Sequence, residues 1–407
     1  ELALKVMTPF VDGAIPQEDL KQLIDKSYAT FRHSGIAPLV QTGHNEWIME
    51  LFHGPTLAFK DFALQFLGNL LDYTLEKRNQ KVVIMGATSG DTGSAAIEGC
   101  RRCSNIDIFI LHPHGRVSDV QRRQMTTVTD ANVHNIAIKG SFDDCQDLVK
   151  AMFNDADFRR KVNISAVNSI NWARILAQIV YYFYAASRLK KRVSFSVPTG
   201  NFGNIYAGYL ARKMGAPIDK LIVATNRNDI LYRFINSGIM KVETVTPSLS
   251  PSMDIQISSN FERLLFDLYD CDADKTRTAM EDFRKYKSFE MEGAAFNKLK
   301  QLFTAFRCDD DQTRQLIADI YNKHDYLLDP HSATGIFAAQ EFLQSHDGPV
   351  ISMATAHPAK FPDAVKDASG IHPELPEFLN DLFSREEKYD VLPNDLDAVK
   401  NYIGQRI

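Results

Sequence analysis

The sequence predicts an α/β fold in which short parallel strands alternate with helices. The first observation behind this prediction is a set of short apolar runs, each typical of a strand that is buried on both faces of a sheet. The second is that polar loops and amphipathic segments separate these runs, as in parallel sheets whose strands are joined by helices. The runs lie at residues 82–85, 107–111, 133–138, 162–167, 193–197, 221–224 and 350–354.

Length and composition are those of an ordinary globular protein with roughly two to three domains. The chain has 407 residues, of which 44% are hydrophobic and 24% charged. Its net charge of −5 gives no reason to expect nucleic acid or a membrane as a partner. No apolar run is long enough to span a membrane and no secretory signal opens the chain, so we expect a cytoplasmic protein. Because the chain begins at Glu1 and not at methionine, we expect that its N-terminus has been shortened.

The cysteines and the acidic run do not indicate a metal site. Five cysteines with scattered spacing predict ordinary thiols and no disulfide framework. Cys100 and Cys103 form a C-x-x-C pattern, but it lies late in a helical stretch, and no second pair completes a zinc site. The acidic run at 309–311 lacks the spaced ligands of a calcium loop, so we interpret it as a solvated turn.

One lysine, Lys60, follows a Gly-Pro turn and opens an amphipathic helix. It lies in the run HGPTLAFKD at 53–61, and apolar residues recur after it at helical spacing. We therefore expect its ammonium at a loop-to-helix junction, beside apolar side chains that can make a lysine an amine nucleophile. The alternative is a surface lysine with a buried stem, which is favoured for any lone lysine.

Two strand-to-helix loops carry residues suited to binding anions. In GNFGN at 200–204, the glycines let the backbone approach a phosphate, and the next helix begins with N–H groups available to it. In TSGDTG at 88–93, hydroxyl and N–H groups could hold a carboxylate. The alternatives are a tight turn for the first loop and a helix cap for the second.

Two further loops complete the set of candidates. The run NSINWAR at 168–174 opens a long helix, and Arg174 could pair with an oxyanion that Asn168 and Ser169 also contact. An Asn cap and a surface arginine are the alternative. TAHPAKF at 355–361 ends the last strand, where a hydroxyl could bond a pyridine nitrogen. His357 in this run could act in acid–base chemistry or be structural.

Together these runs resemble the threonine synthases of bacteria and fungi, which are pyridoxal-phosphate enzymes with a tryptophan-synthase-β-like fold. The matching runs are HGPTLAFKD, ATSGDTG, NSINWAR, PTGNFGN, SPSMDI at 250–255 and TAHPAKF, in the family's order. The resemblance implies two open, twisted, mostly parallel sheets flanked by helices. It divides the chain into an N-terminal helical extension at 1–50, a large cofactor-binding domain at 51–76 and 191–407 with a helical elaboration at about 240–330, and a smaller mobile substrate-binding domain at 77–190.

The resemblance also implies pyridoxal 5'-phosphate as the cofactor and a role for each candidate residue. Lys60 would carry the cofactor covalently and move protons, and Thr355 would bond to its pyridine nitrogen. The residues that bind the cofactor's phosphate would be Gly200, Asn201, Phe202, Gly203 and Asn204. Substrate would be bound by Thr88, Ser89, Asp91 and Thr92 at its carboxylate and by Asn168, Ser169 and Arg174 at its phosphate. Relatives with other substrates commonly have Asn at the position of Asp91, which leaves open whether Asp91 contacts the cofactor.

The implied activity is a lyase reaction of threonine biosynthesis. O-phospho-L-homoserine and water would give L-threonine and phosphate by γ-elimination and β-addition of water. A first alternative keeps the cofactor and is a phospho-lyase or dehydratase acting on another O-phospho or hydroxy amino acid. A second alternative is a non-catalytic binding protein on this fold. The expected partner is the small-molecule substrate, and the expected assembly is a monomer or homodimer.

Overall fold

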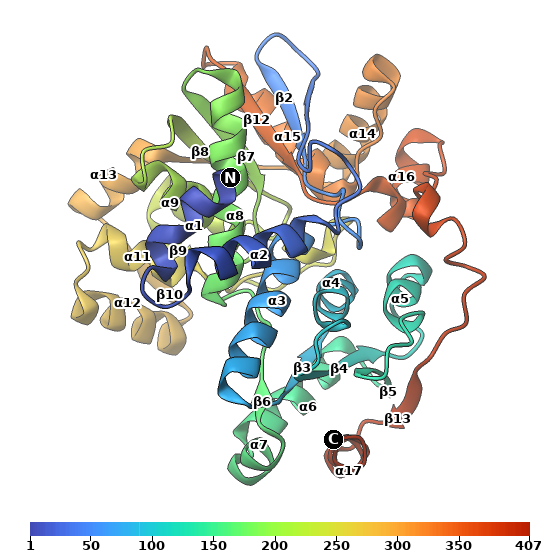
Figure 1. Cartoon of the computed structure of the whole chain (residues 1–407). Helices are drawn as coiled ribbons and strands as arrows, with labels where there is room; N and C mark the ends of the chain where they lie inside the picture. Colours follow the sequence, from blue (N-terminus) through green and yellow to red (C-terminus); the bar gives the residue numbers. More distant parts are fainter. Residues whose placement is uncertain (89) are drawn as a thin grey trace. The chain divides into compact units, whose positions relative to one another are not determined.

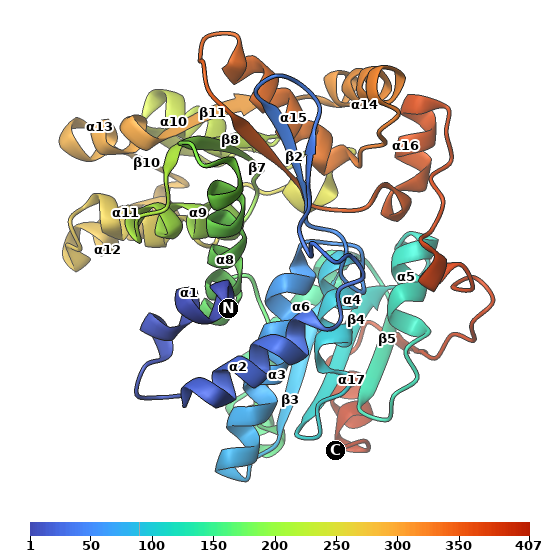
Figure 2. The ribbon, with the colours of Figure 1, turned by 45° about the horizontal axis from the view of Figure 1, so that its top comes forward.

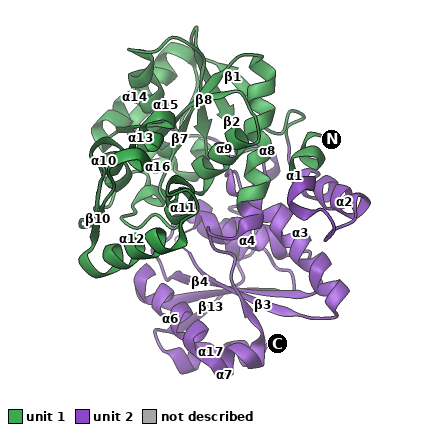
Figure 3. Ribbon diagram, turned by 90° about the vertical axis from the view of Figure 1, so that its left-hand side faces the viewer, with its two compact units in different colours: residues 1–7, 33–53, 175–373 green, residues 8–32, 54–174, 374–407 purple. Residues whose placement is uncertain are grey.

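The computed structural model describes residues 1–88 and 90–407, which group into two compact units (Figure 3). Unit 1 comprises residues 1–7, 33–53 and 175–373, and unit 2 comprises residues 8–32, 54–174 and 374–407. This grouping differs from the expected division, because residues 54–76 and 374–407 fall together with 77–174. The mobility of residues 77–190 stays a prediction. Among the described residues, no helix is long and apolar enough to cross a membrane.

A six-stranded sheet forms the centre of unit 1, in the order β1-β2-β12-β7-β8-β11. The pair β1 and β2 is antiparallel, and the other neighbours pair in parallel. The strands are β1 (Leu39–Gln41), β2 (Glu46–Glu50), β7 (Val193–Pro198), β8 (Ile218–Thr225), β11 (Phe303–Arg307) and β12 (Val350–Ala354). A separate antiparallel pair joins β9 (Ile239–Lys241) to β10 (Ser288–Glu290).

Helices cover both faces of this sheet. On one face α15 packs on β7, β8 and β12 (Figure 1), where Phe342 meets Ile222 and Val350. On the other face, Tyr182 of α8 contacts Phe195 of β7, with ring centroids 4.8 Å apart. The helices are α8 (Trp172–Leu189, grouped with unit 1 from residue 175), α9 (Gly203–Lys213), α10 (Ile230–Ser237), α11 (Phe261–Leu268), α12 (Ala273–Tyr286), α13 (Gly293–Leu302), α14 (Asp310–His324), α15 (Pro330–Leu343) and α16 (Pro362–Ser369).

A five-stranded parallel sheet forms the centre of unit 2, in the order β13-β5-β4-β3-β6. Figure 2 shows β3, β4 and β5 side by side, and Figure 1 shows β13 beside β5. The strands are β3 (Val82–Ala87), β4 (Ile106–Pro113), β5 (Val133–Lys139), β6 (Ile164–Ser165) and β13 (Asp390–Pro393). Because β13 comes from the last residues of the chain, the C-terminal segment is an integral part of this sheet.

Helices also cover both faces of the sheet in unit 2, with α4 on one side and α6 and α17 on the other (Figure 3). The second face is closed by an apolar cluster in which Phe109 and Ile136 pack with Met152 of α6 and Ile403 of α17. The helices are α1 (Leu2–Val11, grouped with unit 2 from residue 8), α2 (Gln17–Tyr28), α3 (Lys60–Arg78), α4 (Asp91–Cys100), α5 (Asp119–Thr126), α6 (Phe142–Asn154), α7 (Ala156–Val162) and α17 (Leu396–Gly404).

Two glycines bring α3 and α4 into backbone contact. A Cβ atom on Gly68 would lie 2.0 Å from the carbonyl oxygen of Gly99, and one on Gly99 would lie 2.4 Å from that of Leu64. Gly68 and Gly99 each stand eight residues after the first residue of their helix, which is Lys60 in α3 and Asp91 in α4. The close approach therefore brings the two helix starts together at one end of the pair.

The predicted α/β fold with mostly parallel sheets is confirmed, with corrections at its edges. The expectation that residues 1–50 are helical is wrong for their last part, which forms β1 and β2. Ile48 and Met49 of β2 are fully buried, because β2 pairs in parallel with β12 and completes the sheet. The elaboration at 240–330 is not wholly helical, since β11 extends the large sheet there. Of the run 162–167, residues 164–165 form a strand and Val162 ends α7.

Candidate active site

Lys60 is the first residue of α3, and only 9% of it is exposed. The loop before it is fixed by the carboxylate of Asp61, which accepts hydrogen bonds from Thr56 N at 2.9 Å and Thr56 Oγ1 at 2.6 Å. Gly54 is needed in this loop, because a Cβ there would lie 2.4 Å from Asp61 Oδ2. The turn therefore fixes the position of Lys60 at the junction of the loop and the helix, where the sequence predicts it.

The amine of Lys60 is paired with Asp91. Lys60 Nζ donates a hydrogen bond to Asp91 Oδ2 at 3.1 Å, and both side chains are buried. Asp91 begins α4, where the N–H groups of the first helical turn favour a negative charge. A carboxylate in that position can accept and return the proton of the amine. The structure thus brings Asp91, predicted as a substrate-binding residue, directly to the lysine.

Thr88 shapes the loop that was predicted to hold a carboxylate. Its Oγ1 accepts hydrogen bonds from Gly90 N at 2.9 Å and Gly93 N at 3.0 Å, so it closes the turn between β3 and α4. Thr92 is half-buried in the first turn of α4. Ser89 lies outside the described residues. The hydroxyl of Thr88 therefore acts as a cap, which is compatible with substrate binding by the same loop.

The segment 168–174 leads into α8. Asn168 is exposed and Ser169 is half-buried. Asn171 caps the helix, because its Oδ1 accepts a hydrogen bond from Ala173 N at 3.0 Å. Asn168 is therefore not needed as the side-chain cap of α8.

Arg174 is a buried cation and not a surface arginine. It is 6% exposed, and its Nη1 donates to the carbonyl oxygen of Val167 at 3.3 Å. Burial lowers the pKa of Arg174 to about 10, because the charged guanidinium is removed from water. An anion bound to a desolvated guanidinium is held more strongly than one bound at the surface.

In unit 1, the glycine loop at 200–204 connects β7 to α9. Its centre is Phe202, which has φ of 64°, an uncommon left-handed conformation for a bulky residue. The ring is locked by Phe261 and Phe303, at centroid distances of 5.4 and 5.8 Å. Aromatic packing thus maintains the strained turn that starts α9.

Residues 258–260 hold the glycine loop from outside. Ser258 Oγ donates to the carbonyl oxygen of Gly200 at 2.7 Å, and Asn260 donates to that of Asn201 from its backbone N at 3.1 Å and its Nδ2 at 3.0 Å. A Cβ on Gly200 would lie 3.1 Å from the carbonyl oxygen of Ser252. The segment 250–260 therefore fixes the path of the loop.

Asn204 offers a buried donor at the start of α9. Its Oδ1 accepts hydrogen bonds from the hydroxyls of Tyr181 at 2.6 Å and Tyr182 at 2.9 Å. Its Nδ2 is buried and has no hydrogen-bond partner within residues 1–88 and 90–407. A buried N–H group without an acceptor is costly, and a phosphate at the helix N-terminus would satisfy it. The loop therefore fits the phosphate of the predicted cofactor.

Thr355 directly follows β12 and is 5% exposed. Its backbone N donates to Ser332 Oγ at 3.0 Å, and Ser332 Oγ in turn donates to the carboxylate of Asp329. Asp329 is fully buried and caps α15. This network fixes the backbone of Thr355 where the sequence predicts the partner of a pyridine nitrogen.

His357 has a structural role in the turn after Thr355. Its Nδ1 accepts a hydrogen bond from Ala359 N at 3.2 Å, which caps the short 3-10 helix Pro358–Lys360. Burial lowers the pKa of His357 to about 4, because the imidazole is removed from water. A neutral, capping histidine is a poor candidate for acid–base catalysis near pH 7.

Comparison with known proteins decides the family. Residues 33–355 match the family described as pyridoxal-phosphate dependent enzymes, and residues 332–403 match the C-terminal region of threonine synthases. The chain is 56% identical to the threonine synthase of Pseudomonas aeruginosa, over all of this chain and 87% of that protein. This chain belongs to the threonine synthase family of pyridoxal-phosphate-dependent enzymes.

Solved structures of threonine synthases share this fold. The pyridoxal-phosphate-bound enzyme from Brucella melitensis superposes with a TM-score of 0.98 and 51% identity, over all of this chain and 88% of that one. The yeast threonine synthase gives a TM-score of 0.95 and 44% identity, with the same coverage. These likenesses confirm the fold and the cofactor that the sequence predicts for this member of the threonine synthase family.

Several residues that support the candidate site were not recognised in the sequence. Ser258 and Asn260 hold the glycine loop, and Gln121 donates to Asp91 Oδ1 at 2.9 Å. The run at 250–255 marks the neighbourhood of Ser258, but it gives no role to individual side chains. A glutamine inside an amphipathic helix carries no signal of its own, so sequence alone could not find Gln121.

The described residues contain no group of three or more His, Cys, Asp or Glu side chains arranged to hold a metal ion. All five cysteines are free thiols, as predicted. Burial raises the pKa of Cys103 to about 12, because a thiolate there would lack water. The C-x-x-C pair is therefore part of the packing of unit 2 and has no reactive thiolate.

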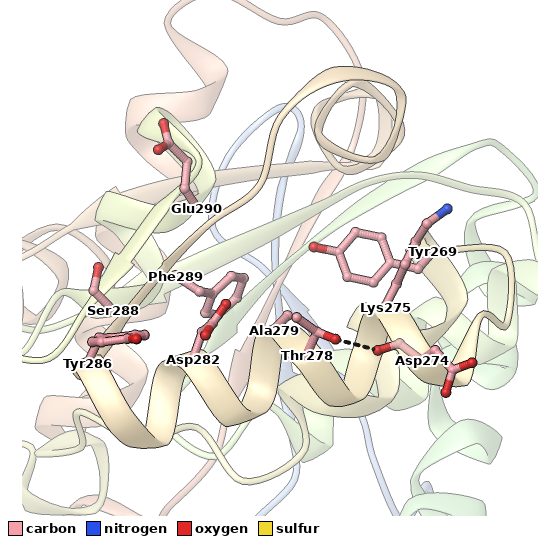
Figure 4. A pocket seen from close by; sticks show the side chains of 10 residues that line it. All are labelled: Tyr269, Asp274, Lys275, Thr278, Ala279, Asp282, Tyr286, Ser288, Phe289 and Glu290. Atoms are coloured by element: carbon pink, nitrogen blue, oxygen red, sulfur yellow. Dashed lines mark hydrogen bonds between the residues drawn. The ribbon is translucent and has the colours of Figure 1, made fainter.

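A groove of about 560 Å³ in unit 1 is lined by none of the candidate residues (Figure 4). Figure 4 shows Asp282 near Tyr286 and Phe289, along α12 and β10. The groove is lined by Tyr269, Asp274, Lys275, Thr278, Ala279, Asp282, Tyr286, Ser288, Phe289 and Glu290. We assign no function to it.

Proposed function

We propose that this member of the threonine synthase family converts O-phospho-L-homoserine and water into L-threonine and phosphate, with Lys60 as its catalytic residue. The observation that supports this most strongly is the buried hydrogen bond from Lys60 Nζ to Asp91 Oδ2 at the shared start of α3 and α4. The reaction needs protons to be removed from and returned to substrate carbons. An amine with a carboxylate 3.1 Å away is equipped for repeated transfers.

The cofactor and the protein divide the chemistry. Pyridoxal phosphate supplies the electron sink that stabilises negative charge on the substrate carbons. Lys60 would hold it covalently, residues 200–204 would bind its phosphate, and Thr355 would bond to its pyridine nitrogen. The donors at the start of α9, with Asn204 Nδ2 among them, support the phosphate assignment. A neutral hydroxyl partner such as that of Thr355 would leave the pyridine nitrogen largely unprotonated.

Two segments of unit 2 would bind the substrate. In the loop with Thr88, Ser89, Asp91 and Thr92, hydroxyl and backbone N–H groups would bind the carboxylate. Asp91 would contribute its backbone N–H group, because its own carboxylate is paired with Lys60. Asn168, Ser169 and Arg174 would take the phosphate. The desolvated guanidinium of Arg174 supports this assignment, because it can pair with two oxygens of a doubly charged group.

Product analysis separates this reaction from its alternatives. Purified protein is incubated with O-phospho-L-homoserine, and phosphate, threonine and keto acid are quantified over time. We expect one threonine for each phosphate and no turnover in Lys60→Ala. Phosphate released together with a keto acid would instead support the alternative phospho-lyase or dehydratase. The absence of any turnover, together with the absence of a cofactor absorption band, would support a binding protein.

The assembly and location of the protein stay predictions. A monomer or homodimer is expected, and light scattering on the purified protein measures its mass directly. The cytoplasmic location predicted from the sequence is checked by fractionation of cells that express the protein.

A further inference from the structure

Helix α5 carries two buried glutamines, one turn apart, that contact the lysine and substrate loops of unit 2. Gln121 Nε2 donates to Asp91 Oδ1 at 2.9 Å, and Gln124 Nε2 donates to the carbonyl oxygen of Thr56 at 3.3 Å. The two side chains are 8% and 7% exposed. Asp91 thus accepts from Lys60 on one carboxylate oxygen and from Gln121 on the other.

The amide of Gln121 is held in one orientation. Ser118 Oγ donates to Gln121 Oε1 at 2.9 Å, so the Nε2 side of the amide faces Asp91. The side chain also lies directly on the substrate loop, because a Cβ on Gly90 would be 2.6 Å from Gln121 Cδ. Gly90 has φ of 143°, and its missing side chain leaves room for this contact. Gln121 is therefore a fixed donor beside the loop.

The other side of α5 is anchored to the C-terminal segment of the chain. Arg122 donates to Glu387 from Nε at 2.8 Å and from Nη2 at 3.0 Å, and Thr126 Oγ1 donates to the same carboxylate at 2.7 Å. An apolar cluster adds packing between the same elements and is formed by Leu57, Val120, Leu379 and Leu382. The position of Gln121 is thus set by contacts that do not involve Lys60 or Asp91.

We infer that Gln121 is a positioning residue for proton transfer at Lys60, acting through Asp91. Its N–H group occupies Oδ1 and leaves Oδ2 directed at Lys60 Nζ. In the steps where the amine is not bonded to the cofactor, a proton passes from Nζ to Oδ2, which leaves a neutral amine and a carboxylic acid, and the reverse transfer restores the ion pair. A donor on Oδ1 favours the ionised carboxylate. It therefore favours return of the proton from Oδ2 to the amine, which leaves Asp91 ready to accept a proton again. The inference rests on the proposed role of Lys60.

The alternative is that Gln121 merely packs α5 against the loop. Gln124 is the matched control, because it is also a buried glutamine of α5 whose Nε2 donates a hydrogen bond to a loop near Lys60. Gln121→Met and Gln124→Met each remove one amide of nearly the same size. Both substitutions should lower the melting temperature by a similar amount. A difference between the two variants in the reactivity of the Lys60 amine would therefore come from the hydrogen bond to Asp91.

The first measurement uses the full chain without its cofactor. Lys60 is labelled by pulsed reductive methylation at fixed pH, and the extent of methylation is measured by peptide mass spectrometry. When Asp91 is no longer oriented, the ammonium loses part of its stabilisation and the reactive neutral amine becomes more abundant. We expect labelling about five times faster in Gln121→Met and within about twofold of wild type in Gln124→Met. Equal labelling in both variants, or no change in Gln121→Met, would overturn the inference.

The second measurement uses the loaded enzyme. In Gln121→Met, kcat should fall about tenfold or more while KM stays within about threefold, because Gln121 itself is assigned no contact with the substrate. Gln121→Glu keeps the size of the side chain but places a second carboxylate beside Asp91, and such a pair retains a proton. The acid limb of its kcat profile should therefore move to higher pH. An unchanged acid limb would contradict the inference. Because the labelling experiment needs no substrate, it remains decisive even if the proposed reaction is wrong.

Discussion

Arg174 differs from the other arginines of its neighbourhood in being almost fully removed from water. Arg159 and Arg160, for example, are exposed on α7. Desolvation of the Arg174 guanidinium is costly, and a bound dianion repays part of this cost through paired, charge-assisted hydrogen bonds. The burial of Arg174 thus supports its proposed role in binding the substrate phosphate.

Replacement of Arg174 by leucine should reduce turnover of O-phosphohomoserine by about a hundredfold or more. A desolvated charge pair contributes roughly 2 to 5 kcal/mol, and its loss appears in kcat/KM. The cofactor absorption band should persist, because residues 200–204 are untouched. Arg160→Leu is the exposed control and should keep its activity. If Arg174→Leu weakens a side reaction with serine as much as the main one, Arg174 is a structural residue and the substrate phosphate is held elsewhere.

Single residues differ in how far the sequence could predict them. Lys60 and Arg174 were found because each stands at a helix start in a distinctive run. The contact between Asp91 and Lys60 could not be predicted, since it depends on how closely two helices separated by a strand pack together. Asn204 was predicted as part of the glycine loop but lies in the first turn of α9. Its unpartnered Nδ2, which supports phosphate binding, is visible only in the structure, where Tyr181 and Tyr182 occupy its Oδ1.

Among the helices, the backbone contact between α3 and α4 sets the spacing of Lys60 and Asp91. Gly99→Ala would place a Cβ 2.4 Å from the carbonyl oxygen of Leu64, so the helices must separate. We expect a loss of about 1 to 3 kcal/mol in the free energy of unfolding, measured in urea, and a lower kcat. Gly404→Ala is the control, because nothing lies within 4 Å of its added Cβ. Wild-type stability and kcat in Gly99→Ala would contradict this account of α3 and α4.

The contact between α5 and Glu387 gives unit 2 a defined pH dependence. Hydrogen bonds from Arg122 lower the pKa of Glu387 to about 2, from 4.5 for an ordinary glutamate. The pKa of Glu387 is lower in the folded protein than in the unfolded chain. This stabilisation is therefore complete above about pH 4.5 and is lost as the pH falls towards 2.

Glu387→Gln should therefore lower the free energy of unfolding by about 2 kcal/mol at pH 7, and by much less near pH 2. This value allows for solvent screening of a partly exposed pair. Asp381→Asn breaks the exposed pair with Arg385 in the same segment and should have a much smaller effect. Urea titrations at both pH values provide the measurement. An equal loss of stability at pH 7 and pH 2 would mean that the charge of Glu387 does not contribute.

The sequence predicted most of the buried strands but missed β2, although Ile48 and Met49 in it are fully buried. The limits of β12 match the predicted range 350–354, because a short apolar run has clear ends. The strands β1, β11 and β13 were missed, since edge strands are short and only partly buried. These edge strands form because the neighbouring strand offers backbone hydrogen bonds, and their own composition gives no clear strand pattern.

At the scale of the whole molecule, sequence order and spatial grouping diverge. Unit 2 is assembled from three separate segments of the chain, and its last strand and helix come from residues 390–404. Sequence-based domain limits treat neighbouring residues as one group, so they assigned residues 374–407 to the large domain. The long-range pairing of β13 with β5 and the Arg122–Glu387 contact account for the grouping found here.

The proposed reaction requires that the protein bind its cofactor covalently at Lys60, the first residue of α3. The most direct test is reduction of the purified, cofactor-loaded protein with borohydride, followed by peptide mapping of the modified lysine. We expect a single pyridoxyl label on Lys60, and neither a label nor a cofactor absorption band in Lys60→Ala. A label on any other lysine of the wild-type protein would contradict it.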